Sequence, residues 1–158
     1  MIIYRQHDGI LDDVVLYELC TLIQALEGHL DIPVESYMKN TRAGLDGRPW
    51  VHVALAYDDA ELVGYKLGRS DDPRCFESWR GGVKSDYRRR GIADQLAAAQ
   101  EEWCRHHNFG CIVTHSTPDN APMLILNLRR GFTISGTVLV RGVNMNVVLH
   151  KSLKTVES

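Results

Sequence analysis

The residues with the clearest chemical potential form a basic, glycine-containing loop between a strand-like segment and a helix-like one. Arg88, Arg89 and Arg90 are followed by Gly91 and by a strongly patterned helical stretch. The first N–H groups of a helix have no partner within it, so a loop that opens a helix offers free donors to an anion. The arginines add permanent positive charge. We therefore predict a pyrophosphate-binding loop; the alternative is a surface turn with solvated arginines.

Cysteine and histidine, which often carry chemistry, show no comparable spacing. None of the four cysteines is in C-x-x-C spacing, which argues against a zinc site or a redox pair. We expect all four to be buried free thiols of a reducing compartment. The seven histidines are scattered, and the adjacent His106 and His107 would point to different sides of a helix. We therefore predict no metal site.

The elements that position the loop follow from hydrophobic periodicity and from glycine and proline punctuation. A helix-like stretch follows the loop. The short apolar segment after this helix is predicted to be a strand, parallel to the strand that precedes the helix. The predicted strands are 1–6, 50–57, 61–68, 75–83, 111–115, 132–141 and 143–151, and the predicted helices are 12–27, 33–39, 91–107 and 120–130, with a loop at 41–49. The order predicts an α+β fold with a mixed sheet, in a single domain spanning 1–158.

Composition narrows the function classes. The chain has 158 residues, 44% of them hydrophobic and 24% charged, as in ordinary globular proteins. A formal net charge of -2 argues against bulk binding of nucleic acid. The apolar runs are too short for a membrane span, and the first residues lack the features of a signal peptide. We expect a cytoplasmic protein with no membrane partner.

Two motifs together resemble a known family. Arg88-Arg89-Arg90-Gly91-Ile92-Ala93 resembles the Q/R-x-x-G-x-G/A acetyl-CoA loop of the GNAT N-acetyltransferases. Asn120, followed by Met123-Leu124 and by Arg130-Gly131-Phe132, is similar to the family's downstream N-x-x-A/M and G-F stretch. The order of elements also matches. The resemblance implies a GNAT-like acyl-CoA N-acyltransferase fold, with a mostly antiparallel sheet, one splayed parallel pair and flanking helices. It implies an acetyl-CoA-dependent N-acetyltransferase that needs no metal.

The resemblance also implies where acetyl-CoA would bind. The pantetheine arm would fill the gap between strands 75–83 and 111–115, and a backbone N–H near Val83 would bind the thioester carbonyl. Asn120 could contact the pantetheine amides, cap its helix, or do both. The implied cofactor-binding residues are Gly82, Val83, Lys84, Ser85, Arg88, Arg89, Arg90, Gly91, Ile92, Ala93, Asn120 and Asn127.

Glu77 is the candidate general base. It precedes Arg88 by eleven residues, where some family members carry that base. An amine is mostly protonated at neutral pH, so a nearby carboxylate must remove a proton, directly or through water. Trp79 would share its face of the strand and form an apolar wall. The alternative is a half-exposed glutamate paired with an arginine or lysine.

Asn127 marks a departure from the family. Many members have a tyrosine there as general acid to the leaving thiolate, and an amide cannot supply that proton. Either another group protonates the thiolate, or the thiolate leaves unprotonated. His115, at the end of a strand beside the implied gap, could be an alternative acid or base, although a structural role is the commoner one for such a histidine.

The acceptor is open from sequence. Acidic residues in the first two helices, with Tyr37 and Trp50 nearby in the chain, hint at a cationic amine, although solvated helix charges explain them equally well: Glu27, Asp31 and Glu35. The two C-terminal strands are plausible material for a homodimer. The main rival function is a non-catalytic acetyl-CoA sensor or partner module. A second rival, a nucleotide-phosphate binder, is disfavoured because the chain lacks the G-K-S/T motif of a P-loop.

Overall fold

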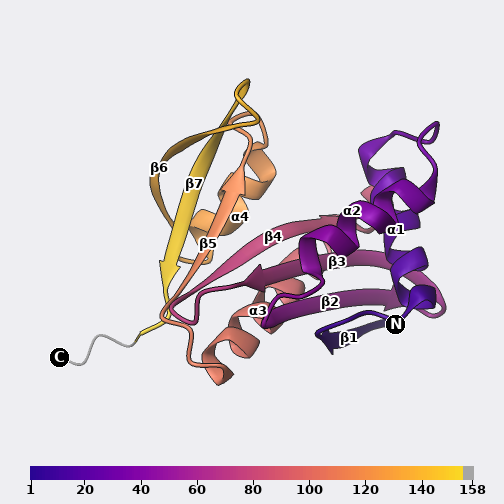
Figure 1. The fold of residues 1–158 in the computed structure, drawn as a ribbon, viewed down its shortest axis with the longest axis horizontal. Helices are drawn as coiled ribbons and strands as arrows, with labels where there is room; N and C mark the ends of the chain where they lie inside the picture. The colour runs from indigo at the N-terminus through magenta and orange to yellow at the C-terminus, as the bar shows by residue number, and fades with distance from the viewer. Residues whose placement is uncertain (155–158) are drawn as a thin grey trace.

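A computed structural model describes residues 1–154 of the chain. A seven-stranded sheet has the order β1-β2-β3-β4-β5-β7-β6 (Figure 1). Neighbouring strands are antiparallel except for β4 and β5, which are parallel, so the predicted mixed sheet is confirmed. The strands are β1 (Ile2–Asp8), β2 (Trp50–Asp58), β3 (Glu61–Ser70), β4 (Cys75–Val83), β5 (Cys111–Ser116), β6 (Thr133–Val140) and β7 (Asn144–Ser152).

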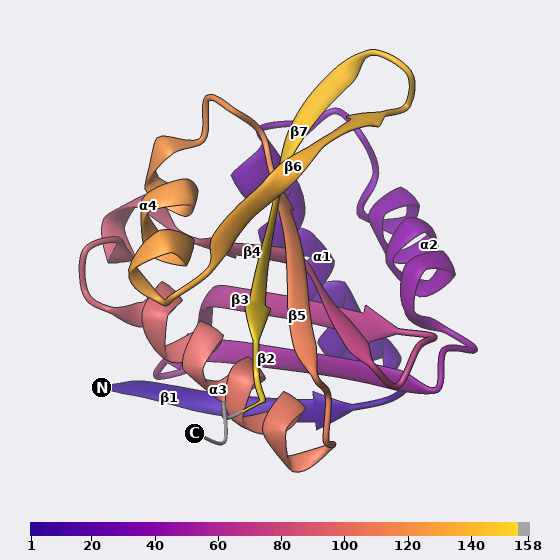
Figure 2. The same ribbon diagram turned by 90° about the vertical axis from the view of Figure 1, so that its left-hand side faces the viewer.

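The helices lie on two sides of the sheet. α1 (Asp13–Glu27) and α2 (Val34–Leu45) lie on one side, whereas α3 (Ile92–His106) and α4 (Ala121–Arg129) lie on the other (Figure 2). Alternation along β2 explains the layers. Val53 and Leu55 point into the core beneath α1 and α2, whereas Ala54 and Ala56 pack with residues of α3.

The second helix is longer than predicted. The sequence placed its end near residue 39 and a loop from Thr41, but α2 continues to Leu45. Thr41 is fully buried, and Gly44 lies beneath Trp79, where a Cβ would come within 2.2 Å of that indole. Glycine normally weakens a helix, so its presence obscured the helical pattern; close packing against β4 explains the residue.

The C-terminal part is a hairpin against β5. β7 pairs with β5 on one side and with β6 on the other. β6 is one of the two edge strands of the sheet and is exposed along nearly its whole length. The Arg130 side chain, at the end of α4, forms ion pairs of 2.7 Å with Asp94 and Glu101 of α3. These contacts join the C-terminal part to α3.

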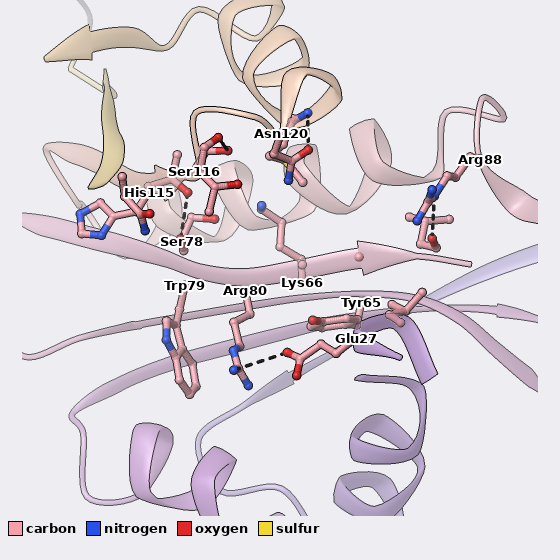
Figure 3. Close-up of a pocket in the computed structure, with 18 residues that line it drawn as sticks. Glu27, Tyr65, Lys66, Ser78, Trp79, Arg80, Arg88, His115, Ser116 and Asn120 are labelled. Carbon is pink, nitrogen blue, oxygen red and sulfur yellow. Dashed lines mark hydrogen bonds and ion pairs between the residues drawn. The ribbon is translucent and has the colours of Figure 1, made fainter. Parts of the chain in front are cut away.

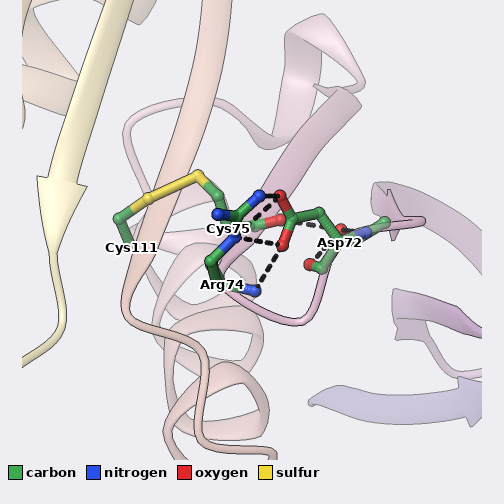
Figure 4. Close-up of a disulfide and its surroundings, with 5 residues drawn as sticks. Asp72, Arg74, Cys75 and Cys111 are labelled. Atoms are coloured by element: carbon green, nitrogen blue, oxygen red, sulfur yellow. Dashed lines mark hydrogen bonds and ion pairs between the residues drawn. A yellow bond between two sulfur atoms is a disulfide. The ribbon is translucent and has the colours of Figure 1, made fainter.

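Cys75 and Cys111 correct one expectation from the sequence. They form a disulfide (Figure 4), whereas Cys20 and Cys104 are buried free thiols. The two cysteines are register partners at the start of the parallel β4–β5 pair, with their Cα atoms 4.8 Å apart. A separation of 36 residues gives no local spacing signal, so only the strand register reveals the pair.

The described residues contain neither a metal-binding cluster nor a membrane-spanning helix. Within residues 1–154, no group of three or more His, Cys, Asp or Glu side chains is placed to hold a metal ion. No helix in that range is long and apolar enough to cross a membrane.

Candidate active site

A cleft opens where β4 and β5 stop pairing. The two strands pair only from Cys75 to Ser78 on β4 and from Cys111 to Thr114 on β5. Beyond that point they diverge, and the gap forms part of a cleft of about 510 Å³ (Figure 3). The predicted splayed pair is therefore present, and the cleft is lined by residues from both sides of the sheet.

Irregular pairing of β4 exposes its backbone to this cleft. The register between β3 and β4 shifts after Leu67, so Trp79 has no direct partner. The Lys84 N–H donates to the Val63 carbonyl on β3 at 2.9 Å. Because successive residues of a strand present their backbone groups to opposite edges, the Val83 N–H faces β5 and the cleft. Val83 thus offers a donor where the sequence placed one.

The arginine loop has the conformation of an anion site. Arg89 and Gly91 both have positive φ, 60° and 76°, and the first α3 hydrogen bond runs from the Gln95 N–H to the Gly91 carbonyl. The first-turn N–H groups of α3 therefore have no partner within the helix. The N-terminal end of the helix dipole adds positive potential. A Cβ at Gly91 would meet no atom within 4 Å, so the position is open to a ligand.

The loop is anchored to the β2–β3 turn. A short 3-10 turn over Ser85–Tyr87, absent from the predicted elements, leads out of β4. The Tyr87 hydroxyl donates to Asp58 at 3.1 Å, and Lys84 forms an ion pair with Glu61. Lys84 is therefore engaged with the protein, whereas Arg88 lines the cleft and donates to the Val83 carbonyl at 3.2 Å.

The opposite side of the cleft is formed by side chains beneath α1. Arg80 Nη2 lies 3.6 Å from Glu27 Oε1, at the end of α1 (Figure 3). Trp79 and Tyr65 line the same region, and burial raises the pKa of Tyr65 to about 12. Tyr65 is thus a neutral hydrogen-bonding group near pH 7. Glu27 is the carboxylate that reaches the cleft here, among residues 1–154.

Glu77 is a partly exposed glutamate that is paired with an arginine, which is the alternative to a general base. Its carboxylate accepts a hydrogen bond of 2.9 Å from Arg69 Nε. Arg69 also lies over the Trp79 ring, 3.9 Å from its centroid, and donates to the Gly44 carbonyl. Glu77 is outside the residues that line the cleft, and its side chain is 36% exposed. Its catalytic role stays a prediction.

Comparisons with known proteins decide the family. Residues 17–132 match the model of the acetyltransferase (GNAT) family. The chain belongs to the GNAT family. It is similar to a mycothiol acetyltransferase of Corynebacterium glutamicum, with 27% identity over 88 residues, which are 56% of this chain and 30% of the relative. The chain thus spans about 30% of the length of the curated relatives that it matches.

Solved GNAT-fold structures cover nearly the whole chain. Ard1 from Thermoplasma volcanium superposes with a TM-score of 0.75 at 13% identity, over 98% of this chain and 99% of that one. YncA from Salmonella typhimurium, solved with its cofactor acetyl-CoA, superposes with a TM-score of 0.69 at 14% identity, over 97% and 96% of the two chains. At identities this low, the superpositions show the fold alone. They confirm the predicted GNAT-like sheet.

The two predicted asparagines occupy different places in this GNAT fold. The Asn120 side chain accepts from the Met123 N–H as the cap of α4, and it also lines the cleft. Asn127 is buried and lines a small cavity behind the cleft instead. Its contact with a cofactor stays a prediction.

Several cleft residues were missed from the sequence. Lys66, Ser78, Thr114 and Ser116 line the cleft, but each comes from a strand interior or end with no motif around it. Bulge register and strand pairing are what bring them together. His115 lines the cleft as its position suggested.

Only some of the residues expected around the acceptor lie at the cleft. Glu27 reaches the cleft, whereas Asp31 and Glu35 are exposed and lie outside its lining. Trp50, expected nearby, packs instead against Phe109, with ring centroids 5.7 Å apart, in the core beside α3. Strand β2 carries it to the end away from α1, which explains the error.

Proposed function

We propose that this chain is an N-acetyltransferase that moves the acetyl group of acetyl-CoA directly to a primary amine in a ternary complex. The observation that carries the proposal is a single cleft that passes between β4 and β5. Arg88 and Asn120 line it on the side of α3 and α4, and Glu27 and Arg80 line it on the side of α1. A thioester and an amine can thus approach each other from opposite sides of the sheet.

The side of α3 and α4 suits coenzyme A. Free N–H groups at the start of α3, with the guanidinium groups of Arg88, Arg89 and Arg90 beside them, match a pyrophosphate in charge and in donors. The unpaired edge of β4 offers hydrogen bonds to the amides of a pantetheine arm. The Val83 N–H, which faces the cleft, would donate to the thioester carbonyl, where negative charge grows during attack.

The side of α1 suits an amine. Glu27 and the aromatic rings of Trp79 and Tyr65 could hold a cationic group, although Arg80 offsets part of the negative charge. Glu77 is our predicted base from sequence. Because it is held by Arg69 outside the cleft lining, Glu27 has the more direct route to an amine. We therefore propose that one of these two carboxylates removes the proton.

The rival role as a non-catalytic acetyl-CoA sensor has one observation in its favour. Asn127, buried behind the cleft, cannot donate a proton to a leaving thiolate. Under that role the chain binds acetyl-CoA but transfers its acetyl group to no amine.

Turnover with defined amines tests these alternatives. Acetyl-CoA would be combined with polyamines, amino acids and peptides, and coenzyme A release measured for the wild type, Glu77→Gln and Glu27→Gln. Loss of the base should lower kcat/KM by about 100-fold near pH 7, and the loss should shrink above pH 9 as the amine deprotonates unaided. The affinity for acetyl-CoA should stay within about twofold.

Each outcome separates the hypotheses. Tight acetyl-CoA binding without transfer to any amine supports the sensor, and no binding at all contradicts both roles. A loss in only one variant assigns the base. Equal, wild-type rates in both variants would remove the two carboxylates from the reaction and leave His115 as the next candidate in the cleft.

We also propose that β6 pairs two copies of the chain. Its side chains are exposed, including Ile134, Val138 and Leu139, and an unpaired edge strand offers free backbone groups to a second strand. Light scattering on the purified protein would show a dimer, and Val138→Lys should shift it toward monomer. A monomer at all concentrations would contradict the proposal.

A further inference from the structure

Lys66 reaches the cleft by crossing a glycine. It lies on β3 opposite Gly81 of β4. A Cβ at Gly81 would lie 3.7 Å from Lys66 Cγ and 3.8 Å from its Nζ. Because Gly81 has no side chain, the lysine side chain passes over β4, and its amine points to the side of Asn120 (Figure 3). Lys66 thus brings a nitrogen into the gap between β4 and β5.

This nitrogen has no partner of its own among residues 1–154. Glu101 of α3, the carboxylate whose charge acts on Lys66, is already paired with Arg130 at 2.7 Å and with Lys151 of β7 at 2.9 Å. Lys66 itself forms no ion pair and no side-chain hydrogen bond in that range. A cation held without a counter-ion beside a cleft is placed to meet negative charge on a ligand.

Several other charged or titratable groups lie around Lys66. They are His52 on β2, Glu101 on α3, Arg130 at the end of α4, Lys151 on β7 and His115 on β5. Burial and, to a smaller extent, the charge of Arg130 lower the pKa of Lys66 to about 8, and the opposing effect of Glu101 is included in that value. Such an amine can both give and take up a proton near neutral pH.

Lys66 also connects the cleft to the cavity that contains Asn127. Both side chains line this small cavity, together with Ser78 and Gln100. The Asn127 side chain in this cavity is an amide, which has no proton to give to a thiolate. Among the residues described, Lys66 and Ser78 line both spaces, and of these two only the lysine ammonium gives up its proton near neutral pH.

We propose that Lys66 is a catalytic residue that protonates the departing coenzyme A thiolate. This role rests on the proposed acetyltransferase function. The acceptor nitrogen forms a bond to the acetyl carbon, and the C–S bond breaks with its electron pair remaining on sulfur. The proton on Lys66 Nζ passes to that sulfur. The neutral Lys66 amine then regains a proton from solvent. The proton lost by the acceptor amine passes through the carboxylate base to solvent, so the protons balance.

The first experiment measures the thiol of bound coenzyme A without any acceptor. Lys66→Met keeps the length of the side chain but removes its charge and its proton. Thiolate absorbance in the ultraviolet, followed against pH, gives the pKa of the bound thiol. Wild type should bind the thiolate form about tenfold more favourably than Lys66→Met does, which corresponds to about one pKa unit. Desulfo-coenzyme A, which lacks the sulfur, should bind both proteins equally.

The second experiment measures turnover. Lys66→Met should lower kcat by about 100-fold and leave the KM for acetyl-CoA within a few-fold, as expected for a lost general acid. Lys66→Arg keeps the positive charge but holds its proton too tightly to give it up. It should therefore restore the thiol pKa and leave kcat low. Lys39→Met, on the exposed face of α2 and outside the cleft lining, is the matched control.

The outcomes separate this proposal from the broader one. If the wild type neither binds coenzyme A nor acetylates an amine, the proposed function fails and the role of Lys66 falls with it. If the wild type is active and Lys66→Met keeps the same bound-thiol pKa and kcat, only the Lys66 proposal is overturned. It is also overturned if Lys66→Met weakens coenzyme A and desulfo-coenzyme A equally, because that pattern marks a general contact. Lys66→Gln serves for the same measurements if Lys66→Met does not fold.

Discussion

The two halves of the β4–β5 pair differ in what holds them. From Cys75 to Ser78, parallel pairing, a disulfide and the hydroxyl of Thr114, which donates to the Ser78 carbonyl at 3.0 Å, close the strands together. From Trp79 to Val83 the same strand is irregular and contains two glycines, and its edge toward β5 is open. In the closed half the backbone groups facing β5 are paired within the sheet, whereas in the open half they are free to bind a ligand.

This difference predicts that substitutions divide by location. Changes in the closed half outside the cleft-lining Ser78 and Thr114, including the core beneath it, should alter the free energy of unfolding and leave ligand binding intact. Changes in the open half and its loop should do the reverse. A substitution that altered both quantities equally would break the distinction.

The largest effect is expected from the disulfide in the closed half. Replacing both residues, Cys75→Ser with Cys111→Ser, should lower the free energy of unfolding by about 4 kcal/mol, the loop-closure value for 36 residues. Denaturant titration measures this. Reductant should destabilise the wild type by a similar amount and leave the double variant unchanged. Coenzyme A affinity in the folded variant should stay within about twofold.

The core beside the closed half should respond to acid. Burial lowers the pKa of His52 to about 4, and its ring lies 5.1 Å from that of Trp103, which contacts Phe76 of β4. Between pH 6.5 and 4 the unfolded chain binds a proton that the folded chain resists. Stability should therefore fall by about 3 kcal/mol as the pH drops through this window.

Urea titrations at pH 7.5 and pH 4.5 measure the fall. His52→Gln, which cannot titrate and can still donate to Gln6 as the imidazole does, provides the reference. A pH dependence equal to that of the wild type in this variant would show that other groups cause the acid loss.

In the open half, backbone conformation at Gly91 should govern coenzyme A binding. Gly91 has a φ of 76°, a region that β-branched residues avoid and asparagine tolerates. Gly91→Val should raise the Kd for coenzyme A by about 100-fold, or about 2.7 kcal/mol, and Gly91→Asn by only a few-fold. Calorimetry measures both. Equal affinity in Gly91→Val and the wild type would rule out the loop as the pyrophosphate site.

Local features of the sequence predicted most of the fold and one side of the cleft. The arginine loop lies within a single stretch, and the anion binding that we propose for it depends on backbone groups whose positions follow from the strand–loop–helix order. Asn120 was found in the same way, because a helix cap is encoded by nearby residues. The strands and three of the helices follow from periodicity, and α2 was shortened only because Gly44 serves packing instead of helix propensity.

The other side of the cleft depends on contacts between distant segments. Glu27 meets Arg80 across 53 residues because α1 lies against β4, and Lys66 enters only because Gly81 is its register partner. Glu77 was placed by its distance from the loop. Its pairing with Arg69 follows from register and a bulge, which no spacing within β4 could reveal.

The disulfide gives the chain a covalent ring. Arg88, Arg89 and Arg90 lie between its two cysteines, on an exposed loop of the kind that trypsin cuts. A single cut there would open the ring without releasing a fragment, so the strand before the loop and the helix after it would remain one molecule. The arginine loop could thus lose its peptide continuity while its two flanking elements stay tethered until a reductant separates them.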